Sequence, residues 1–225
     1  MSVPSYAWDF SFLWGYRWLI LLGLGVTILY TIGTILLGLL LGLVTGLLRL
    51  SRNKLLTAPL VAYVEIFRCT PLLVQIIWFY YALPVVVGID IPAHVAAISV
   101  LSLYGGAFYA EIVRGSIESI HVGQWDAARA LGLSPWRVLR LVILPQALKP
   151  MLAPYVNQSV TQLKNTSLVS VIAVPDLVYN ATLINADTYR PLEVYTIVAL
   201  IYFAILFPAT LVARRFERGL TYDKA

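Results

Sequence analysis

Polar side chains recur at helical spacing in residues 157–170, a stretch with few charges and many apolar neighbours. Asn157, Thr161, Lys164 and Ser167 follow one another at intervals of three or four residues, so in a helix they share one face. In an apolar helix such a face lines a water-filled cavity or joins neighbouring helices by hydrogen bonds. The spacing therefore predicts a polar surface that could contact a small polar solute.

Lys164 is the only charged residue on this face. In a helix it lies about 20 Å beyond Pro150, which is deep for an ammonium group that must reach the inner membrane surface. A buried, unpaired ammonium group is costly, so it requires a partner. That partner is either the carboxylate of a bound solute or an acid of the protein, and Glu65 is the acid of this chain that fits.

A second apolar segment also contains charges. Glu65 and Arg68 are three residues apart, so on a helix they can pair. A charge near the bilayer centre costs about 2.5–3.5 kcal/mol on insertion scales, so we expect both side chains to face the protein interior or a cavity. Two readings stay open, an ion pair that fixes the helix orientation and a gate or pathway element. Pro71 predicts a kink just beyond the pair.

A third apolar segment ends in small and charged residues. The small residues 105–107 permit close helix contact. Tyr104 is a candidate solute contact, although an aromatic residue here is more often part of the core or the interface. Glu111 and Arg114 are again three residues apart, at the end of this segment.

Residues 121–145 stand between two apolar spans without belonging to either. Their apolar residues have helical spacing, Gly132 interrupts the pattern and Pro145 ends it. This predicts two short helices joined by a hinge, with a left-handed backbone at Gly132. Trp125 and Trp136 are the candidates for contact with a partner. The segment therefore fits a docking surface for a cytoplasmic protein.

The composition is that of a membrane protein: 60% of the 225 residues are hydrophobic and 12% are charged, about half the charged share of a soluble domain. One cysteine excludes an intrachain disulfide, and the two histidines, His94 and His121, are too far apart to favour a metal site. The chain has no P-loop motif, so any ATP hydrolysis takes place on a partner. The basic residues fall in short loops between spans, so they do not indicate nucleic-acid binding.

Five segments are long and apolar enough to cross a bilayer, which takes about 20 residues. The first is too long for a cleaved signal peptide and has no basic stretch before it, so we expect it to remain as an anchor. The expected fold is an all-α membrane protein of one domain, residues 1–225, with a cytoplasmic loop at 114–149. The five spans are 18–48, 55–87, 94–112, 150–174 and 192–212.

The distribution of lysine and arginine predicts the orientation. One set of loops holds 12 of these residues and the other set holds two, Arg17 and Arg190. Met1 is therefore expected outside and Ala225 inside. The outer loops are expected to be acidic, with Asp9, Asp90, Asp176, Asp187 and Glu193. The 12 residues are Arg49, Arg52, Lys54, Arg114, Arg129, Arg137, Arg140, Lys149, Arg214, Arg215, Arg218 and Lys224.

Four motifs, taken in order along the chain, resemble the permease subunits of polar amino-acid ABC importers. Residues 68–75, Arg-Cys-Thr-Pro-Leu-Leu-Val-Gln, resemble a signature in which Gly stands at the position of Cys69. Residues 107–112 keep the family's Ala-aromatic-x-Ala-Glu-Ile order, and residues 164–168 resemble its Lys-Asp/Asn-Thr-Ser-Leu motif. The coupling loop of the family has its spacing matched at Asp126, Ala127, Ala128, Gly132, Val142, Leu144 and Pro145, with Asp126 replacing Glu and Val142 replacing Ile.

The resemblance implies a type I importer fold and a non-enzymatic transport subunit of the bacterial inner membrane. It implies a second permease, a cytoplasmic ATPase dimer that binds ATP and magnesium, an extracytoplasmic solute-binding protein and an amino-acid solute; the chain itself takes no cofactor. The implied pathway residues are Glu65, Arg68, Thr70, Gln75, Tyr104, Thr161, Lys164, Asn165 and Ser167. The implied ATPase-coupling residues are Trp125, Asp126, Ala127, Ala128, Gly132 and Pro145.

Two other classes of protein compete with this reading. A channel or secondary transporter would work without an ATPase, but inverted-repeat transporters show two matching halves and this chain shows none. A membrane anchor that docks a partner would need no polar face in the fourth span, yet Asn157 to Ser167 supply one. A neighbouring gene for an ATPase and one for a secreted binding protein would separate these alternatives.

Overall fold

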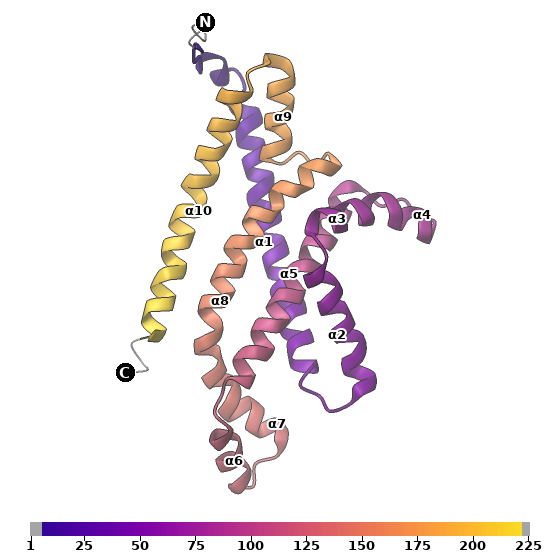
Figure 1. Cartoon of the computed structure of the whole chain (residues 1–225), viewed down its shortest axis with the longest axis vertical. Coiled ribbons are helices and arrows are strands. Elements are labelled where there is room, and N and C mark those ends of the chain that lie inside the picture. Colours follow the sequence, from indigo (N-terminus) through magenta and orange to yellow (C-terminus); the bar gives the residue numbers. More distant parts are fainter. Residues whose placement is uncertain (1–5, 222–225) are drawn as a thin grey trace, which may run out of the picture.

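The computed structural model describes residues 6–221, with side chains described as far as Arg215. Four long helices run along the long axis of the molecule, α1 (Arg17–Leu48), α5 (Ala93–Glu118), α8 (Leu144–Asn165) and α10 (Pro191–Thr221) (Figure 1). The predicted positions of Met1 and Ala225 relative to the membrane fall outside the described residues. The fold is all-helical over the described part, as predicted.

Shorter helices connect and flank the long ones. Figure 1 shows α9 and the start of α10 at the end where the chain begins, and α6 and α7 at the opposite end. The helices α3 and α4 leave the bundle sideways. Their bounds are α2 Lys54–Cys69, α3 Leu72–Ile77, α4 Leu83–Val87, α6 Val122–Ala130, α7 Pro135–Arg137 and α9 Leu177–Thr188; the 3₁₀-helices are η1 Ser11–Trp14 and η4 Thr166–Ile172, and the π-helices are η2 Trp78–Ala82 and η3 Val138–Ile143.

Three described helices, α1, α5 and α10, are long and apolar enough to span a membrane. Two further spans exist if each of two bent helix pairs crosses as one unit. The pair of α2 with residues 72–87 bends by 110°, and the pair of residues 135–172 with α9 bends by 48°. The structure therefore has three to five candidate spans, and the predicted five is the upper figure.

Small residues allow α1 and α5 to pack closely. Gly38, Gly42 and Gly46 recur every fourth residue on α1, so they form one buried face. A Cβ at Gly42 would lie 2.4 Å from the Cβ of Tyr109 and 2.9 Å from the backbone nitrogen of Ala110. Only glycine fits this helix crossing, which fixes α5 at the centre of the bundle.

The predicted kink at Pro71 is a complete break in the structure. The helix α2 ends at Cys69, Thr70 is extended with φ −105° and ψ 136°, and α3 begins at Leu72. Proline lacks an N–H group and disfavours the helical conformation in the residue before it, which explains the break at this place. Gln75 stabilises it, because its Nε2 donates to the carbonyls of Phe67 and Thr70, both at 3.0 Å.

The prediction that Pro145 ends the coupling segment is wrong. The chain stays helical from Pro135 to Ile172, and Pro145 lies near the start of α8. The π-helix Val138–Ile143 immediately precedes this proline. A wider π turn accommodates the ring and the missing N–H donor, so the helix continues without a break.

Two acids predicted to make the outer loops acidic are buried instead. Asp176 is 1% exposed and caps α9, where Oδ1 accepts from the backbone nitrogen of Tyr179 at 2.8 Å. Glu193 is 0% exposed and accepts from the Tyr6 hydroxyl at 2.6 Å and from Arg190 at 3.0 Å. Both carboxylates stabilise helix starts and chain contacts at this end of the bundle.

Candidate functional site

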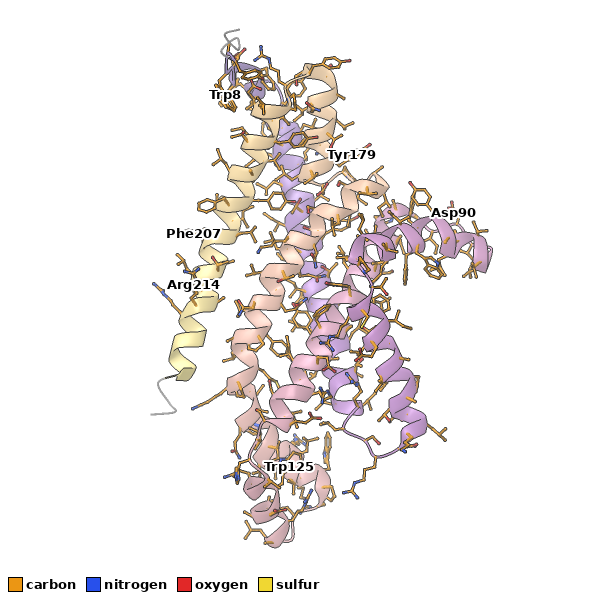
Figure 2. All side chains as sticks on the ribbon, in the orientation of Figure 1. Trp8, Asp90, Trp125, Tyr179, Phe207 and Arg214 are labelled. Atoms are coloured by element: carbon orange, nitrogen blue, oxygen red, sulfur yellow. The ribbon has the colours of Figure 1, made fainter. Side chains whose placement is uncertain are left out.

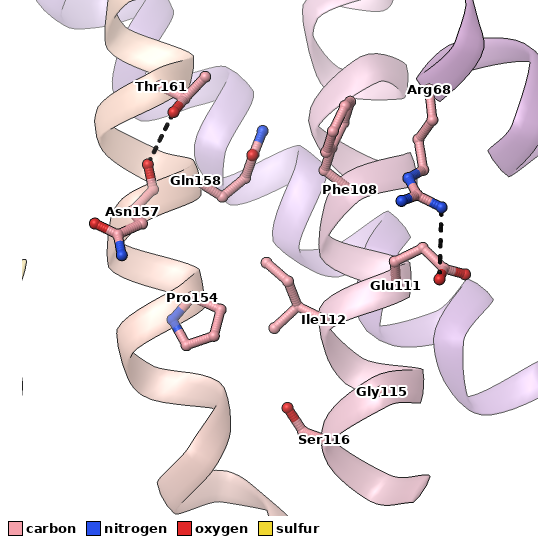
Figure 3. A pocket seen from close by; sticks show the side chains of 10 residues that line it. All are labelled: Arg68, Phe108, Glu111, Ile112, Gly115, Ser116, Pro154, Asn157, Gln158 and Thr161. Atoms are coloured by element: carbon pink, nitrogen blue, oxygen red, sulfur yellow. Dashed lines mark hydrogen bonds and ion pairs between the residues drawn. The ribbon is translucent and has the colours of Figure 1, made fainter. Parts of the chain in front are cut away.

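A cavity of about 500 Å³ lies between α5 and α8, with α2 at its edge (Figure 3). Its wall mixes charged, polar and apolar groups, and six of its residues carry the argument below. They are Arg68 from α2, Phe108 and Glu111 from α5, and Asn157, Gln158 and Thr161 from α8.

Arg68 contributes a cation to this wall. Its Nη1 lies 3.5 Å from Oε2 of Glu111 and 3.9 Å from Oε1 of Glu65. Its guanidinium lies 5.8 Å from the centre of the Phe108 ring, within cation–π range. Neither ion pair is tight, and the Arg68 side chain is 36% exposed, so its guanidinium retains donors for another anion.

Glu111 connects three arginines. Its carboxylate accepts from Arg49 and from Nη2 of Arg114 at 2.9 Å, in addition to the contact with Arg68. The side chain of Glu111 is 17% exposed, and Arg114 also contacts Glu118 at 2.5 Å. This cluster joins the end of α1, α2 and α5, and it holds one wall of the cavity in place.

The opposite wall is the polar face of α8. Asn157 and Thr161 are exposed and line the cavity, and the Thr161 hydroxyl donates to the Asn157 carbonyl at 3.0 Å (Figure 3). Gln158 also lines the cavity, and its Nε2 is buried with no hydrogen-bond partner among the described residues. A donor of this kind is available to a solute oxygen.

On another face of α8, Gln162 is fully buried and donates to the Leu101 carbonyl at 2.7 Å and to Thr34 at 3.3 Å. The polar residues of α8 thus have two roles: some line the cavity, and others join α8 to neighbouring helices. The two readings of the polar face given by the sequence both apply, to different residues.

Lys164 lies on the exposed side of α8 and forms no ion pair with any described acid. The internal salt bridge to Glu65 is absent from the structure. Lys164 does not line the cavity. The Ser167 hydroxyl donates to the Lys164 carbonyl at 2.8 Å, so it is engaged with the backbone.

The predicted pathway residues fall into separate groups. Arg68 and Thr161 line the cavity, and Glu65 stands at its edge beside Arg68. Thr70 and the buried Gln75 lie at the break after α2.

Tyr104 and Asn165 lie side by side where α5 meets the end of α8, and Lys164 and Ser167 lie in the same region. Sequence reasoning did not include Phe108, Glu111, Asn157 or Gln158 among the pathway residues. The sequence does contain an indication for Glu111, because a carboxylate within an apolar span is costly and marks a charged partner or a functional site. Asn157 had one too, since it begins the polar face.

The predicted hinge in the coupling segment is confirmed. The helices α6 and α7 are separate, and Gly132 between them has φ +74° in the left-handed region. A Cβ at Gly132 would meet nothing within 4 Å. The hinge therefore has a left-handed backbone, which favours glycine, and open space around it.

The coupling residues differ in how accessible they are. Asp126, Ala127 and Pro145 are exposed, and Trp125 is half-buried. Ala128 is 3% exposed and packs in the chain's own core with Val113 and Ile117, so its side chain is not accessible to a partner. Ala128 instead secures α6 against α5, and Trp136, 63% exposed, lies on the open surface.

Residues 35–222 match a family described as binding-protein-dependent transport system inner membrane component. The chain is 38% identical over 210 residues to the probable glutamine ABC transporter permease protein of Bacillus subtilis (strain 168), across 92% of this chain and 93% of that protein. It is 36% identical over 213 residues to the glutamine transport system permease protein of Escherichia coli (strain K12), across 94% and 97%.

The fold is similar to that of a chain in a crystal structure of an amino acid ABC transporter with histidines. The TM-score is 0.88 and the sequence identity is 36%, and the match covers 95% of this chain and 100% of that one.

Proposed function

Because this chain belongs to the binding-protein-dependent transport system inner membrane components and is the permease subunit of an amino-acid ABC importer, we propose that the cavity beside Arg68 is part of its solute pathway. The subunit lies in the bacterial inner membrane, crosses it several times and is not itself an enzyme. Subunits of this family carry no cofactor. The channel, secondary-transporter and simple-anchor alternatives are therefore set aside.

The observation that carries the pathway proposal is the composition of the cavity wall. Arg68 offers a partly satisfied guanidinium, which suits the α-carboxylate that every amino acid has. Gln158 offers an unpaired amide donor, and Asn157 and Thr161 add polar surface across the cavity. The charged cluster around Glu111 keeps Arg68 at the wall while leaving its other donors available.

We propose that the solute is a polar amino acid and that this subunit forms half of its path. Two relatives carry glutamine in their names, and the related crystal structure contains histidines. A second stage of the path, beyond the cavity, would be formed by Lys164, Asn165, Ser167 and Tyr104. The polar surface of α8 that is open in the single chain supports completion by a second permease.

The proposed orientation has five spans, the N-terminus outside and the C-terminus inside. The turn after α1, the α6–α7 segment and the far end of α10 lie toward one end of the molecule (Figure 1). These segments hold most of the 12 lysine and arginine residues, and Arg114, Arg140 and Lys149 lie in the neighbouring α5, η3 and α8. Figure 2 shows Trp125 at this end and Trp8 at the other. The basic end fits the cytoplasmic side.

We propose that α6 and α7, within the loop 114–149, transmit motion of the ATPase. The importer requires an ATPase and a solute-binding protein as partners, and the ATPase would hold ATP and magnesium. Asp126, Ala127 and Trp136 present an exposed surface, while Ala128 fastens α6 to α5. Closure of the ATPase dimer would therefore move α5 and the cavity wall with it.

The variant Gly132→Asp tests this coupling proposal. Gly132 has open space around it, so the new side chain does not clash within the permease. We expect normal membrane insertion with at least a ten-fold loss of ATPase association or of ATP-driven uptake, measured by co-purification and by uptake into proteoliposomes. A charged group on a docking surface commonly costs more than the ~1.4 kcal/mol that a ten-fold change represents.

Gly132→Asn is the matched control, because asparagine has nearly the same shape, carries no charge and tolerates the left-handed conformation equally well. It should keep most of the uptake. Full uptake by the Asp variant would show that this hinge does not contact the ATPase.

A further inference from the structure

A second hollow, of about 710 Å³, lies at the basic end of the molecule. It opens between the turn that follows α1 and the coupling helices α6 and α7. Most of its lining is aliphatic or aromatic, and two guanidinium groups stand in its wall. The residues that matter here are Leu47, Leu56, Leu139, Trp125, Arg52 and Arg129.

The charges at this hollow are not balanced within the described part of the chain. Arg52 is exposed and forms no ion pair with another described residue. Arg129 contacts Asp126 at 3.3 Å, but their side chains are 60% and 64% exposed, so water screens that pair. The Arg129 guanidinium also lies 5.9 Å from the centre of the Trp125 ring, which orients it at the wall.

The position of the hollow matches a membrane boundary. Leu47 lies at the last turn of the span α1, and Leu56 lies at the first turn of α2. A tryptophan side chain is favoured at the level of the lipid headgroups, and Trp125 stands there beside the arginines. The apolar floor therefore faces hydrocarbon, while the guanidinium groups lie at headgroup depth.

We propose that this hollow binds an anionic phospholipid of the cytoplasmic leaflet. The phosphate contacts Arg52 and Arg129, and an acyl chain lies along Leu47, Leu56 and Leu139. A free phosphate ion would leave the apolar lining uncovered, and a neutral lipid would leave one positive charge without a counter-charge. The proposal rests on the orientation proposed above, in which this end faces the cytoplasm.

Such a lipid would bridge two segments of the permease that are both attached to α5. The turn after α1 is fixed to α5 through Arg49 and Glu111, and α6 is fixed to α5 through Ala128. A lipid in the hollow fills the space between the turn and α6. It would thereby stabilise the packing of the turn and of α6 around α5.

The test uses the assembled importer, reconstituted in nanodiscs with a photoreactive phosphatidylglycerol or with the matching phosphatidylcholine. After illumination, mass spectrometry measures lipid adducts on residues 47–56 and 125–139. One basic residue near an anionic surface contributes about a five-fold preference. We expect phosphatidylglycerol to label these segments at least five-fold more than phosphatidylcholine, and Arg52→Gln with Arg129→Gln to abolish the preference.

Arg214→Gln is the matched control, since Arg214 is exposed on the C-terminal half of α10 and does not line the hollow (Figure 2). It should leave labelling unchanged. Leu56→Trp, which fills the apolar part, should reduce labelling while Arg52 and Arg129 remain. ATPase association and uptake, measured on the same samples, report separately on the proposed function.

Three results would overturn the lipid proposal. Equal labelling by the two lipids would exclude charge recognition. Full displacement by free inorganic phosphate would reduce the site to an anion contact. Labelling of the isolated permease that disappears in the assembled importer would show that the ATPase covers the hollow instead.

Discussion

Charged side chains of this permease neutralise one another in ion pairs and clusters that join different helices. Arg49, Arg68 and Arg114 surround Glu111, and the further acids Glu65 and Glu118 complete the neutralisation. Only Arg68 of these arginines lines the cavity. An anion that enters the cavity therefore meets one arginine whose position is fixed by its neighbours and whose donors are partly unused.

The first prediction concerns Glu111→Gln. The change removes the one carboxylate that three arginines share, while keeping the size of the side chain. We expect a loss of about 2 kcal/mol in stability, less than the ~3–5 kcal/mol for fully buried pairs because Arg68 and Arg114 are partly exposed. Thermal unfolding in detergent measures it, with an expected decrease of about 5 °C.

Glu118→Gln is the control for this prediction, because it makes the same change of charge on the same helix at a side chain that is 54% exposed. Its effect should stay below about 0.5 kcal/mol. Equal destabilisation by the two variants would refute a central role for Glu111.

The second prediction concerns Lys164→Met, which keeps length and removes charge. Lys164 has no ion pair with a described acid, so the permease should assemble normally. If its ammonium contacts the solute carboxylate, uptake falls by ten-fold or more, since a hydrogen bond to a charged group contributes about 1.5–3 kcal/mol. Uptake and ATP hydrolysis in proteoliposomes separate the two readings.

Poor assembly of the same variant would instead indicate a structural role for the Lys164 ammonium group. An assembled Lys164→Met importer with unchanged uptake would remove Lys164 from the pathway.

At the scale of elements, α5 is the axis on which the site depends. It contacts α1 through glycine, α2 through the arginine cluster and α8 across the cavity. Gly38, Gly42 and Gly46 set the distance between α1 and α5, and Arg49 follows them at the end of α1. The packing of α1 therefore helps to position Glu111 and, through it, Arg68.

The sequence was sufficient for the long helices, because an apolar stretch of about 20 residues has few other stable structures in a bilayer. It was also sufficient for the hinge at Gly132. It did not predict α9 as a separate helix, the angle at Pro71 or the burial of Asp176 and Glu193. Those features depend on contacts between distant segments, which local spacing does not contain.

For the candidate site, spacing predicted the polar face of α8 and the charges on α2, but not their depth. Arg68 and Thr161 line the same cavity because their helices, α2 and α8, both pack against α5. The periodicity of the sequence does not predict which helices pack together. Gln75 was predicted to line the path, and the structure shows that it also stabilises the break after α2 by donating to two carbonyls. Its role in the pathway remains a prediction.

The third prediction tests the helix contact. Gly42→Ala places a methyl group 2.4 Å from the Cβ of Tyr109 and close to the backbone of α5, which cannot yield easily. We expect a loss of about 1–3 kcal/mol, as for other overpacked interiors, measured by thermal unfolding and by the amount of permease in the membrane.

Gly25→Ala is the matched control on the same helix, since a Cβ there meets nothing within 4 Å. It should be neutral or stabilising by about 0.5–1 kcal/mol through helix propensity. Similar losses from both substitutions would mean that helix propensity, not packing, governs α1.

At the scale of the whole molecule, the two bent helix pairs determine how many times the chain crosses the membrane. If both pairs cross the membrane there are five spans, and if both return to the side they came from there are three. Both counts are odd, so each puts the C-terminus on the side opposite to the N-terminus. A periplasm-active reporter fused after Ala225 should therefore be silent in either case, and activity there would contradict both.

The last prediction separates five spans from three by the loops between them. With the N-terminus outside, five spans put Asp90 outside and the α6–α7 segment inside, whereas three spans with two re-entrant pairs exchange these two positions. The single native cysteine, Cys69, is exposed, so the experiment starts from Cys69→Ser. Asp90→Cys and Ser134→Cys then each add one thiol at an exposed position, the first just after the sideways helix α4 (Figure 2) and the second just before α7. In intact cells stripped of their outer membrane, an impermeant maleimide should label Asp90→Cys and leave Ser134→Cys unlabelled until the inner membrane is permeabilised. The reverse pattern would establish three spans and would place the coupling helices on the outside, where no ATPase can reach them.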